Sequence, residues 1–310
     1  MSAETQTDIH NDAQTVGVIG LGLMGSALSQ RFIEAERNVI GFDPREECRQ
    51  QLRDIGGEPV DSADAVFQAA NVVVLSLPNS DIVVEVCAVA RRLRAAENST
   101  MQTTRTDRLR IIDTTTGDPV RTTELGQSLW EVGIDYLDAT LTGSSQQARA
   151  GELVVTAGGR PESFQQSEPL FRDFAKQSFH VGPWGSGAKT KLIVNLVLGL
   201  NRAVLAEGLS LAQACGLELN EVLNVLRSGA AYSRAMDTKG RKMIESDFAP
   251  EAKLAQHWKD VRLILEMSDR VEATTPLSQL HEGLLSDLVQ RGFGDFDNSS
   301  VIRAFDRKAE

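Results

Sequence analysis

The stretch VGVIGLGLMG, residues 16–25, decides the fold. It starts with a short β-branched run, and the pattern after it predicts a helix from about Met24. Gly20, Gly22 and Gly25 have the G-x-G-x-x-G spacing, in which the first glycine allows a tight turn, the second admits a pyrophosphate, and the third lets helix and strand pack closely. The N–H groups at the helix start attract the anion, so the stretch predicts a dinucleotide-binding turn. Its members are Gly20, Leu21, Gly22, Leu23, Met24 and Gly25.

Downstream of this turn, strand-like and helix-like segments alternate. Residues 38–42, 72–77 and 111–112 are strand-like, and residues 44–52 and 81–93 between them have helical spacing. Strands that alternate with helices predict βαβ units and a parallel sheet with helices on its faces. We therefore expect an α/β domain of the Rossmann type, doubly wound around a mostly parallel sheet.

The character of the chain changes after residue 180. Residues 182–187, GPWGSG, form a breaker-rich hinge, and residues 188–215 contain no proline and a dense apolar pattern. A helix of that length is about 40 Å long and, being apolar on most of its circumference, should be buried between domains or subunits. We predict a disordered tail over 1–14, a Rossmann domain over 15–182 and an all-helical substrate and oligomerisation domain over 183–310.

Composition narrows the class of protein. The chain has 310 residues, of which 41% are hydrophobic and 24% charged, as in an ordinary globular protein. Its formal charge of −11 disfavours nucleic acid as a partner. Cys48, Cys87 and Cys215 are far apart and no Cys/His cluster has ligand spacing, so we expect reduced thiols, no metal and a cytoplasmic location. The apolar stretch 192–200 is too short to span a bilayer, so no membrane segment is expected.

An acidic residue marks the end of the second predicted strand. Asp43 follows Gly20 by 23 residues, where a carboxylate accepts hydrogen bonds from the adenosine ribose. Because this carboxylate would repel a 2′-phosphate, NAD is favoured over NADP. Arg45 is within reach of a phosphate, and we interpret it as a solvated arginine at a helix start.

A second cofactor segment follows the strand predicted at 72–77. Leu77, Pro78 and Asn79 lie at its carboxyl end, where ligands gather in open parallel sheets. Their backbone is placed to line the cofactor, although a proline-initiated turn explains the same residues equally well.

The long helix carries the candidate acid/base. Lys191 and Asn195 are four residues apart and share one face of it. A lysine among apolar residues loses its proton more easily than usual and can exchange a proton with a substrate hydroxyl. The alternative is a lysine that extends its amine to water along the helix surface. Lys189 points to a different face and to solvent.

Two polar segments follow other predicted strands. Residues 138–145, DATLTGSS, offer N–H and hydroxyl donors to a carboxylate, and residues 113–116, DTTT, end a buried strand in the same way. Lys259 and Asp260 lie on an amphipathic helix, where a surface ion pair is the simplest interpretation. Taken alone, each segment is explained as well by an ordinary loop or surface pair.

Together these features resemble the β-hydroxyacid dehydrogenase family, which includes 3-hydroxyisobutyrate, tartronate-semialdehyde and threonate dehydrogenases within the 6-phosphogluconate dehydrogenase superfamily. The order of the motifs makes the resemblance specific. They are GLGLMG at 20–25, DTTTGDP at 113–119, DATLTGS at 138–144, GSGAKTK at 185–191 with Asn195 after it, and Lys259-Asp260.

The resemblance implies a role for each motif. Lys191 would be the general acid/base with Asn195 beside it, acting on a small carboxylate substrate. Lys259 would reach into the substrate pocket, and Thr116 would lie near the nicotinamide. The resemblance also implies a homodimer or homotetramer and an NAD(P)-dependent oxidation at a CH–OH group. The substrate carboxylate would be bound by Thr142, Gly143 and Ser144.

Four positions depart from the family pattern. Thr140 replaces a proline, Thr142 a serine, Ser144 a glycine and Val194 an asparagine. These changes lie where substrates are selected, so the reaction type is expected and the substrate is left open. Two alternatives remain, namely an imine reductase, whose relatives typically lack a lysine at position 191, and a non-catalytic NAD-binding protein on the same fold.

Overall fold

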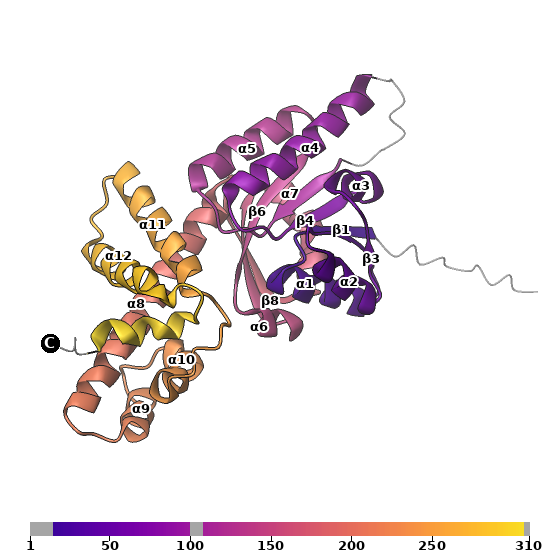
Figure 1. The fold of residues 1–310 in the computed structure, drawn as a ribbon. Helices are drawn as coiled ribbons and strands as arrows, with labels where there is room; N and C mark the ends of the chain where they lie inside the picture. The colour runs from indigo at the N-terminus through magenta and orange to yellow at the C-terminus, as the bar shows by residue number, and fades with distance from the viewer. Residues whose placement is uncertain (1–14, 100–107, 307–310) are drawn as a thin grey trace, which may run out of the picture.

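The computed structural model describes residues 15–99 and 108–306. A sheet-containing half and a helical half lie on either side of the long helix α8 (Ser186–Ala214), as Figure 1 shows. This confirms the predicted α/β class with a second, helical domain. The tail predicted over 1–14 lies outside the described residues.

The first half is built on one eight-stranded sheet in the order β3-β2-β1-β4-β5-β6-β7-β8. All neighbouring strands are parallel except β6 and β7, which are antiparallel. The strand order reverses between β1 and β4, and open α/β sheets bind ligands at the carboxyl ends of such strands. The strands are β1 (Thr15–Ile19), β2 (Asn38–Phe42), β3 (Glu58–Pro59), β4 (Val72–Leu75), β5 (Arg110–Asp113), β6 (Asp135–Thr142), β7 (Leu153–Gly159) and β8 (Ala175–Gly182).

Helices cover both faces of this sheet because its strands alternate apolar side chains between the faces. Val16 and Val18 pack into one core with α1, α2 and α7, while Ile19 packs into the other core with α3, α4 and α5. The helices are α1 (Leu23–Glu34), α2 (Glu46–Asp54), α3 (Ala63–Ala69), α4 (Ser80–Ser99), α5 (Pro119–Glu131), α6 (Ser145–Arg149) and α7 (Pro161–Phe171).

The helical half has a core of its own. Leu205 and Leu209 of α8 pack there with Met236, Val261 and Leu285 from three other helices. The elements of this half are α9 (Leu219–Ser228), α10 (Arg234–Glu245), α11 (Leu254–Arg270), α12 (Pro276–Leu288), the π-helical turn η1 (Val289–Phe293) and the 3-10 helix η2 (Asn298–Phe305).

Helix α8 is only partly covered by the rest of the chain. By length and composition alone it could cross a membrane, with a mean hydropathy of 1.5, but core helices pass the same test, and 44% of its most apolar window is buried here. Ile193, Val197, Val204 and Leu211 remain exposed along it. A second subunit would cover such a strip, and the homodimer or homotetramer stays a prediction.

Candidate active site

The glycine turn joins β1 to α1, and its backbone is closely packed at Gly20 and Gly25. Gly20 has φ +91°, and a Cβ on Gly25 would lie 1.8 Å from the Gly20 carbonyl oxygen. By contrast, a Cβ on Gly22 would meet only the Arg45 guanidinium, at 3.5 Å. Gly22 is the N-cap of α1 and supplies no side-chain cap, so the first N–H groups of the helix are open to an anion. This geometry fits the pyrophosphate of a dinucleotide.

Asp43 lies buried beside this turn at the end of β2. Its Oδ2 accepts a hydrogen bond from the Leu21 N–H at 2.9 Å, and Arg45 binds both carboxylate oxygens at 3.0 and 3.1 Å. Burial raises the pKa of Asp43, but the bonds from Arg45 and Leu21 outweigh it, so the net pKa is below the usual value. The side chain of Arg45 is half exposed, in line with the prediction of a solvated arginine, but it is also paired with Asp43.

The segment after β4 meets the helical domain. The strand ends at Leu75, before the predicted residue 77, because the Leu77 N–H donates to Thr115 Oγ1 instead of to the neighbouring strand. The side chain of Asn79 accepts from the Ile82 N–H at the start of α4. These contacts place Leu77, Pro78 and Asn79 at the carboxyl edge of the sheet.

Lys259 of α11 crosses the domain boundary. Its Nζ donates to the Thr116 carbonyl at 2.9 Å and to the Pro78 carbonyl at 3.4 Å, and it pairs with Asp260 at 3.3 Å. Lys259 therefore does more than form a surface ion pair with Asp260. Its two bonds to carbonyls connect the helical domain to the segments that follow β4 and β5.

An ion pair also crosses this boundary. Both carboxylate oxygens of Asp118, the N-cap of α5, accept from Arg270 of α11 at 2.9 Å. The bonds from Arg270, together with two backbone N–H groups, outweigh burial and lower the pKa of Asp118. This pair could not be predicted from local pattern, because its members are 152 residues apart.

Lys191 lies in the second turn of α8, close to this boundary and partly buried. Burial lowers its pKa from 10.5 to about 8, while the charge of Asp260 raises it and the charges of Arg202 and Lys259 lower it further. A lysine in this state can hold or release a proton near neutral pH. Lys189, by contrast, is exposed.

Asn195 lies one turn below Lys191 and is buried. Its Nδ2 donates to Asp260 Oδ2 at 2.8 Å, so it orients Asp260, the carboxylate whose charge acts on Lys191. Burial raises the pKa of Asp260, and the nearby charges of Lys259 and Lys191 lower it in part. The structure thus groups Lys191, Asn195 and Lys259 around Asp260.

Asp138, near the middle of β6, fixes the start of α8. Its carboxylate accepts from the Gly185 N–H at 3.1 Å and from the Ala188 N–H at 2.9 Å. Burial raises its pKa to about 6 despite these two bonds. A Cβ on Gly187 would lie 2.0 Å from the Asp138 carbonyl, so only glycine lets helix and strand meet here. Asp138 therefore positions the helix that carries Lys191.

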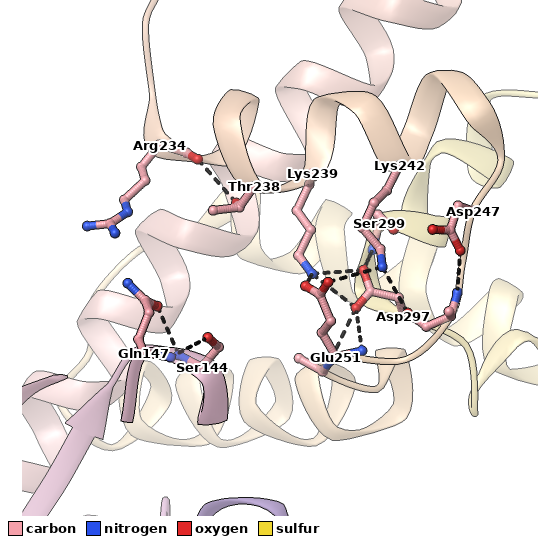
Figure 2. Close-up of polar contacts among 12 residues, drawn as sticks. Ser144, Gln147, Arg234, Thr238, Lys239, Lys242, Asp247, Glu251, Asp297 and Ser299 are labelled. Carbon is pink, nitrogen blue, oxygen red and sulfur yellow. Dashed lines mark hydrogen bonds and ion pairs between the residues drawn. The ribbon is translucent and has the colours of Figure 1, made fainter. Parts of the chain in front are cut away.

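The loop after β6 is organised by a capping box. Ser144 Oγ accepts from the Gln147 N–H at 3.2 Å, and the Ser144 N–H donates to Gln147 Oε1 at 3.0 Å, as Figure 2 shows. Gly143 has φ +138°, which favours glycine. The Ser144 N–H donates within the loop and its hydroxyl oxygen accepts there. Among the described residues, no hydrogen bond joins Thr142 or Ser144 to Lys191 or Lys259.

Two family models cover the chain from the first strand to η2. Residues 15–182 match the NAD binding domain of 6-phosphogluconate dehydrogenase, and residues 185–305 match the NAD-binding domain of NADP-dependent 3-hydroxyisobutyrate dehydrogenase. Together with the fold and the glycine turn, they define a protein with a nicotinamide-dinucleotide-binding domain of the Rossmann type. The chain belongs to the β-hydroxyacid dehydrogenase family, which confirms the resemblance of its motifs.

Curated relatives are moderately similar. The chain is 29% identical to 2-(hydroxymethyl)glutarate dehydrogenase of Eubacterium barkeri, over 94% of this chain and 95% of that one. It is 27% identical to the cytokine-like nuclear factor N-PAC of Drosophila melanogaster, over 97% of this chain, and spans half the length of that protein. A solved structure of 3-hydroxyisobutyrate dehydrogenase from Mycobacterium tuberculosis has the same fold, with a TM-score of 0.84, 24% identity and coverage of 95% of this chain and 99% of that one.

Proposed function

We propose that the protein catalyses the reversible, NAD-linked oxidation of a small β-hydroxy acid to its semialdehyde or keto acid. The observation that carries the proposal is a partly buried lysine, Lys191, whose pKa is lowered to about 8 at the boundary between the cofactor domain and the helical domain. A general acid/base works best with a pKa near the working pH.

The chain's own residues would divide the work as follows. Bound NAD would accept the two electrons of the substrate C–H bond. Lys191 would take the hydroxyl proton. The charge of Asp260 would act on the Lys191 amine, and Asn195 would orient Asp260 by its hydrogen bond. Thr142, Gly143 and Ser144 remain our candidates for the substrate carboxylate, and the capping box occupies the Ser144 N–H while its hydroxyl O–H can still donate.

Asp43 supports NAD rather than NADP. Its carboxylate is buried next to the glycine turn, and it neutralises Arg45, the nearest cation to that turn. A 2′-phosphate would meet a negative charge and a guanidinium that is already paired. NAD binding would in turn let the ribose hydroxyls compete with Arg45 for the same carboxylate.

The cofactor preference can be tested by removing that carboxylate. We expect Asp43→Ala to raise the ratio of NADPH to NADH affinity by at least about tenfold, because Arg45 is then free to bind a phosphate. Fluorescence titration of both cofactors measures this ratio without any substrate. The Asp43→Ala/Arg45→Ala double variant is the control and should lose the gain, whereas a wild-type preference for NADPH would overturn the NAD assignment.

The two alternatives lack support of this kind. Imine reductase structures, such as that from Streptomyces aurantiacus with a TM-score of 0.62 and 16% identity, share only the fold with this chain. The relatives named cytokine-like nuclear factor N-PAC are not named for an oxidoreductase activity. Lys191, with its lowered pKa, favours a hydroxy-acid dehydrogenase over both.

The proposed reaction is tested with a panel of three- to six-carbon hydroxy acids and NAD. We expect at least one β-hydroxy acid to produce NADH, followed as absorbance, at a rate that depends on both substrates. Absence of NADH with every member, from protein shown to bind NADH, would contradict the proposal and favour the non-catalytic alternative.

A further inference from the structure

The polar stripe of α8 continues past the proposed acid/base. Arg202 follows Lys191 by eleven residues, which is close to three full turns, so both side chains leave the helix on the same side. Asn195 lies between them on that stripe. Helical side chains lean toward the N-terminus, so Arg202 leans toward Asn195 and Lys191. Its Cα is about 16 Å from that of Lys191 along the axis, and the long side chain of Arg202, which leans toward Lys191, shortens that gap.

Arg202 has no acceptor of its own. Within the described part of the chain, no hydrogen bond or ion pair involves it, although it is partly buried. Burial lowers its pKa to about 10, while the charges of Asp297 and Asp260 raise it, so it remains a cation at neutral pH. The five donors of this guanidinium are therefore available to an added acid group.

The carboxylates that act on Arg202 are engaged elsewhere. Asp260 holds Asn195 and Lys259. Asp297 accepts from Lys239 and from three backbone N–H groups, and Figure 2 shows it enclosed by Lys239, Glu251 and Ser299. Neither carboxylate is therefore a hydrogen-bonding partner of Arg202.

Two neutral imidazoles lie near Arg202. The rings of His257 from α11 and His281 from α12 are 5.2 Å apart and press on α8 at Gly199, where a Cβ would lie 2.4 Å from His257 Nε2. Burial, with the charge of Arg202, lowers the pKa of both rings, that of His281 to about 4. His257 Nε2 is buried and has no hydrogen-bond partner among the described residues.

The charges that act on Lys191 do not balance. They are the carboxylate of Asp260 and the cations Arg202 and Lys259. Asp297, the other carboxylate that acts on Arg202, is already paired with Lys239, so cationic side chains outnumber the remaining carboxylates around Lys191. A substrate with a single carboxylate would leave positive charge in excess. A substrate with two acid groups would offset both Lys259 and Arg202.

We propose that Arg202, flanked by His257 and His281, binds a second acid group of the substrate, which makes the preferred substrate a dicarboxylic β-hydroxy acid. This inference rests on the proposed oxidation at Lys191. Bound NAD would accept the hydrogen of the substrate C–H bond together with its electron pair, and the hydroxyl proton would pass to Lys191. The product is a semialdehyde that keeps both carboxylates. Arg202 touches no reacting atom. It selects the substrate by binding the acid group that lies farther from the oxidised carbon.

The kinetic test compares 3-hydroxypropanoate, with one carboxylate, against 2-(hydroxymethyl)succinate and 2-(hydroxymethyl)glutarate, with two. We expect the wild type to prefer a dicarboxylate by at least about tenfold in kcat/KM. Arg202→Met should lose about 10- to 100-fold with the dicarboxylate, mainly through KM, and change little with the monocarboxylate. Arg202→Lys should recover part of the loss, and Arg241→Met, at an exposed arginine of α10, should change neither rate.

A binding test separates this inference from the proposed reaction. Glutarate, which cannot be oxidised, should raise the Tm of the wild type more than butanoate does, and Arg202→Met should abolish the difference. That result without NADH formation from any acid would support the acid-binding role of Arg202 and contradict the oxidation. NADH formation with a discrimination that Arg202→Met leaves intact would overturn the role of Arg202 alone. A change in subunit association in Arg202→Met, with unchanged discrimination, would overturn it as well and point to a partner subunit's carboxylate.

Discussion

Lys191→Ala is expected to lower turnover of a β-hydroxy acid by at least about 10²-fold while NADH binding stays within about twofold of wild type. The loss has this size because a positioned acid/base contributes that much to a proton transfer. The variant should fold, since the change removes a charge that burial disfavours. Steady-state NADH formation and fluorescence titration of NADH measure the two quantities separately.

Lys189→Ala is the matched control for this change. Lys189 lies on the same helix two residues earlier and is exposed, so its removal should leave turnover within about twofold of wild type. Near-normal turnover in Lys191→Ala, or an equal loss in both variants, would contradict the role of Lys191 as general acid/base.

The second large effect is expected at the glycine turn, where two substitutions of equal size should behave differently. In Gly25→Ala the new methyl group would lie 1.8 Å from the Gly20 carbonyl oxygen, and backbone cannot swing away as a flexible side chain does. We expect a loss of about 1–3 kcal/mol in unfolding free energy, together with loss of cofactor binding.

Gly22→Ala separates fold from cofactor. Its methyl group would meet only the Arg45 guanidinium at 3.5 Å, so the free protein should keep its Tm. The same methyl group would stand where the pyrophosphate approaches the backbone, so NADH affinity should fall at least about tenfold. Thermal unfolding and NADH titration of both variants test this, and wild-type affinity in Gly22→Ala would place the pyrophosphate elsewhere.

The fold class could be predicted from the sequence because its determinants are local, whereas the site residues remain predictions. The glycine spacing and Asp43 lie within 24 residues of one another, and each residue type has a direct steric or electrostatic reason to be there. The strand predicted over 72–77 ended early at Leu75 because of Thr115, a residue 38 positions from Leu77. Local pattern contains no information about such a partner.

The parts that sequence missed depend on distant contacts. The hydrogen bond from the Gly185 N–H to Asp138, at the start of α8, joins residues 47 positions apart. The Asp118–Arg270 pair joins residues 152 positions apart. Arg202 did leave a signal, since it repeats the helical phase of Lys191 and Asn195 eleven residues on. Extending the polar face of the predicted helix by two turns would have found it.

The pH dependence of kcat/KM in the oxidation direction tests the role of Lys191 most directly. Only the neutral amine can accept the hydroxyl proton, so kcat/KM should rise with pH and level off above about pH 8, the pKa of Lys191. In the reduction direction the protonated amine is needed, and kcat/KM should fall over the same range. In Lys191→Ala this dependence of kcat/KM on pH should be absent in both directions. A wild-type profile that is flat across that range, or a pH dependence that persists in Lys191→Ala, would contradict the account.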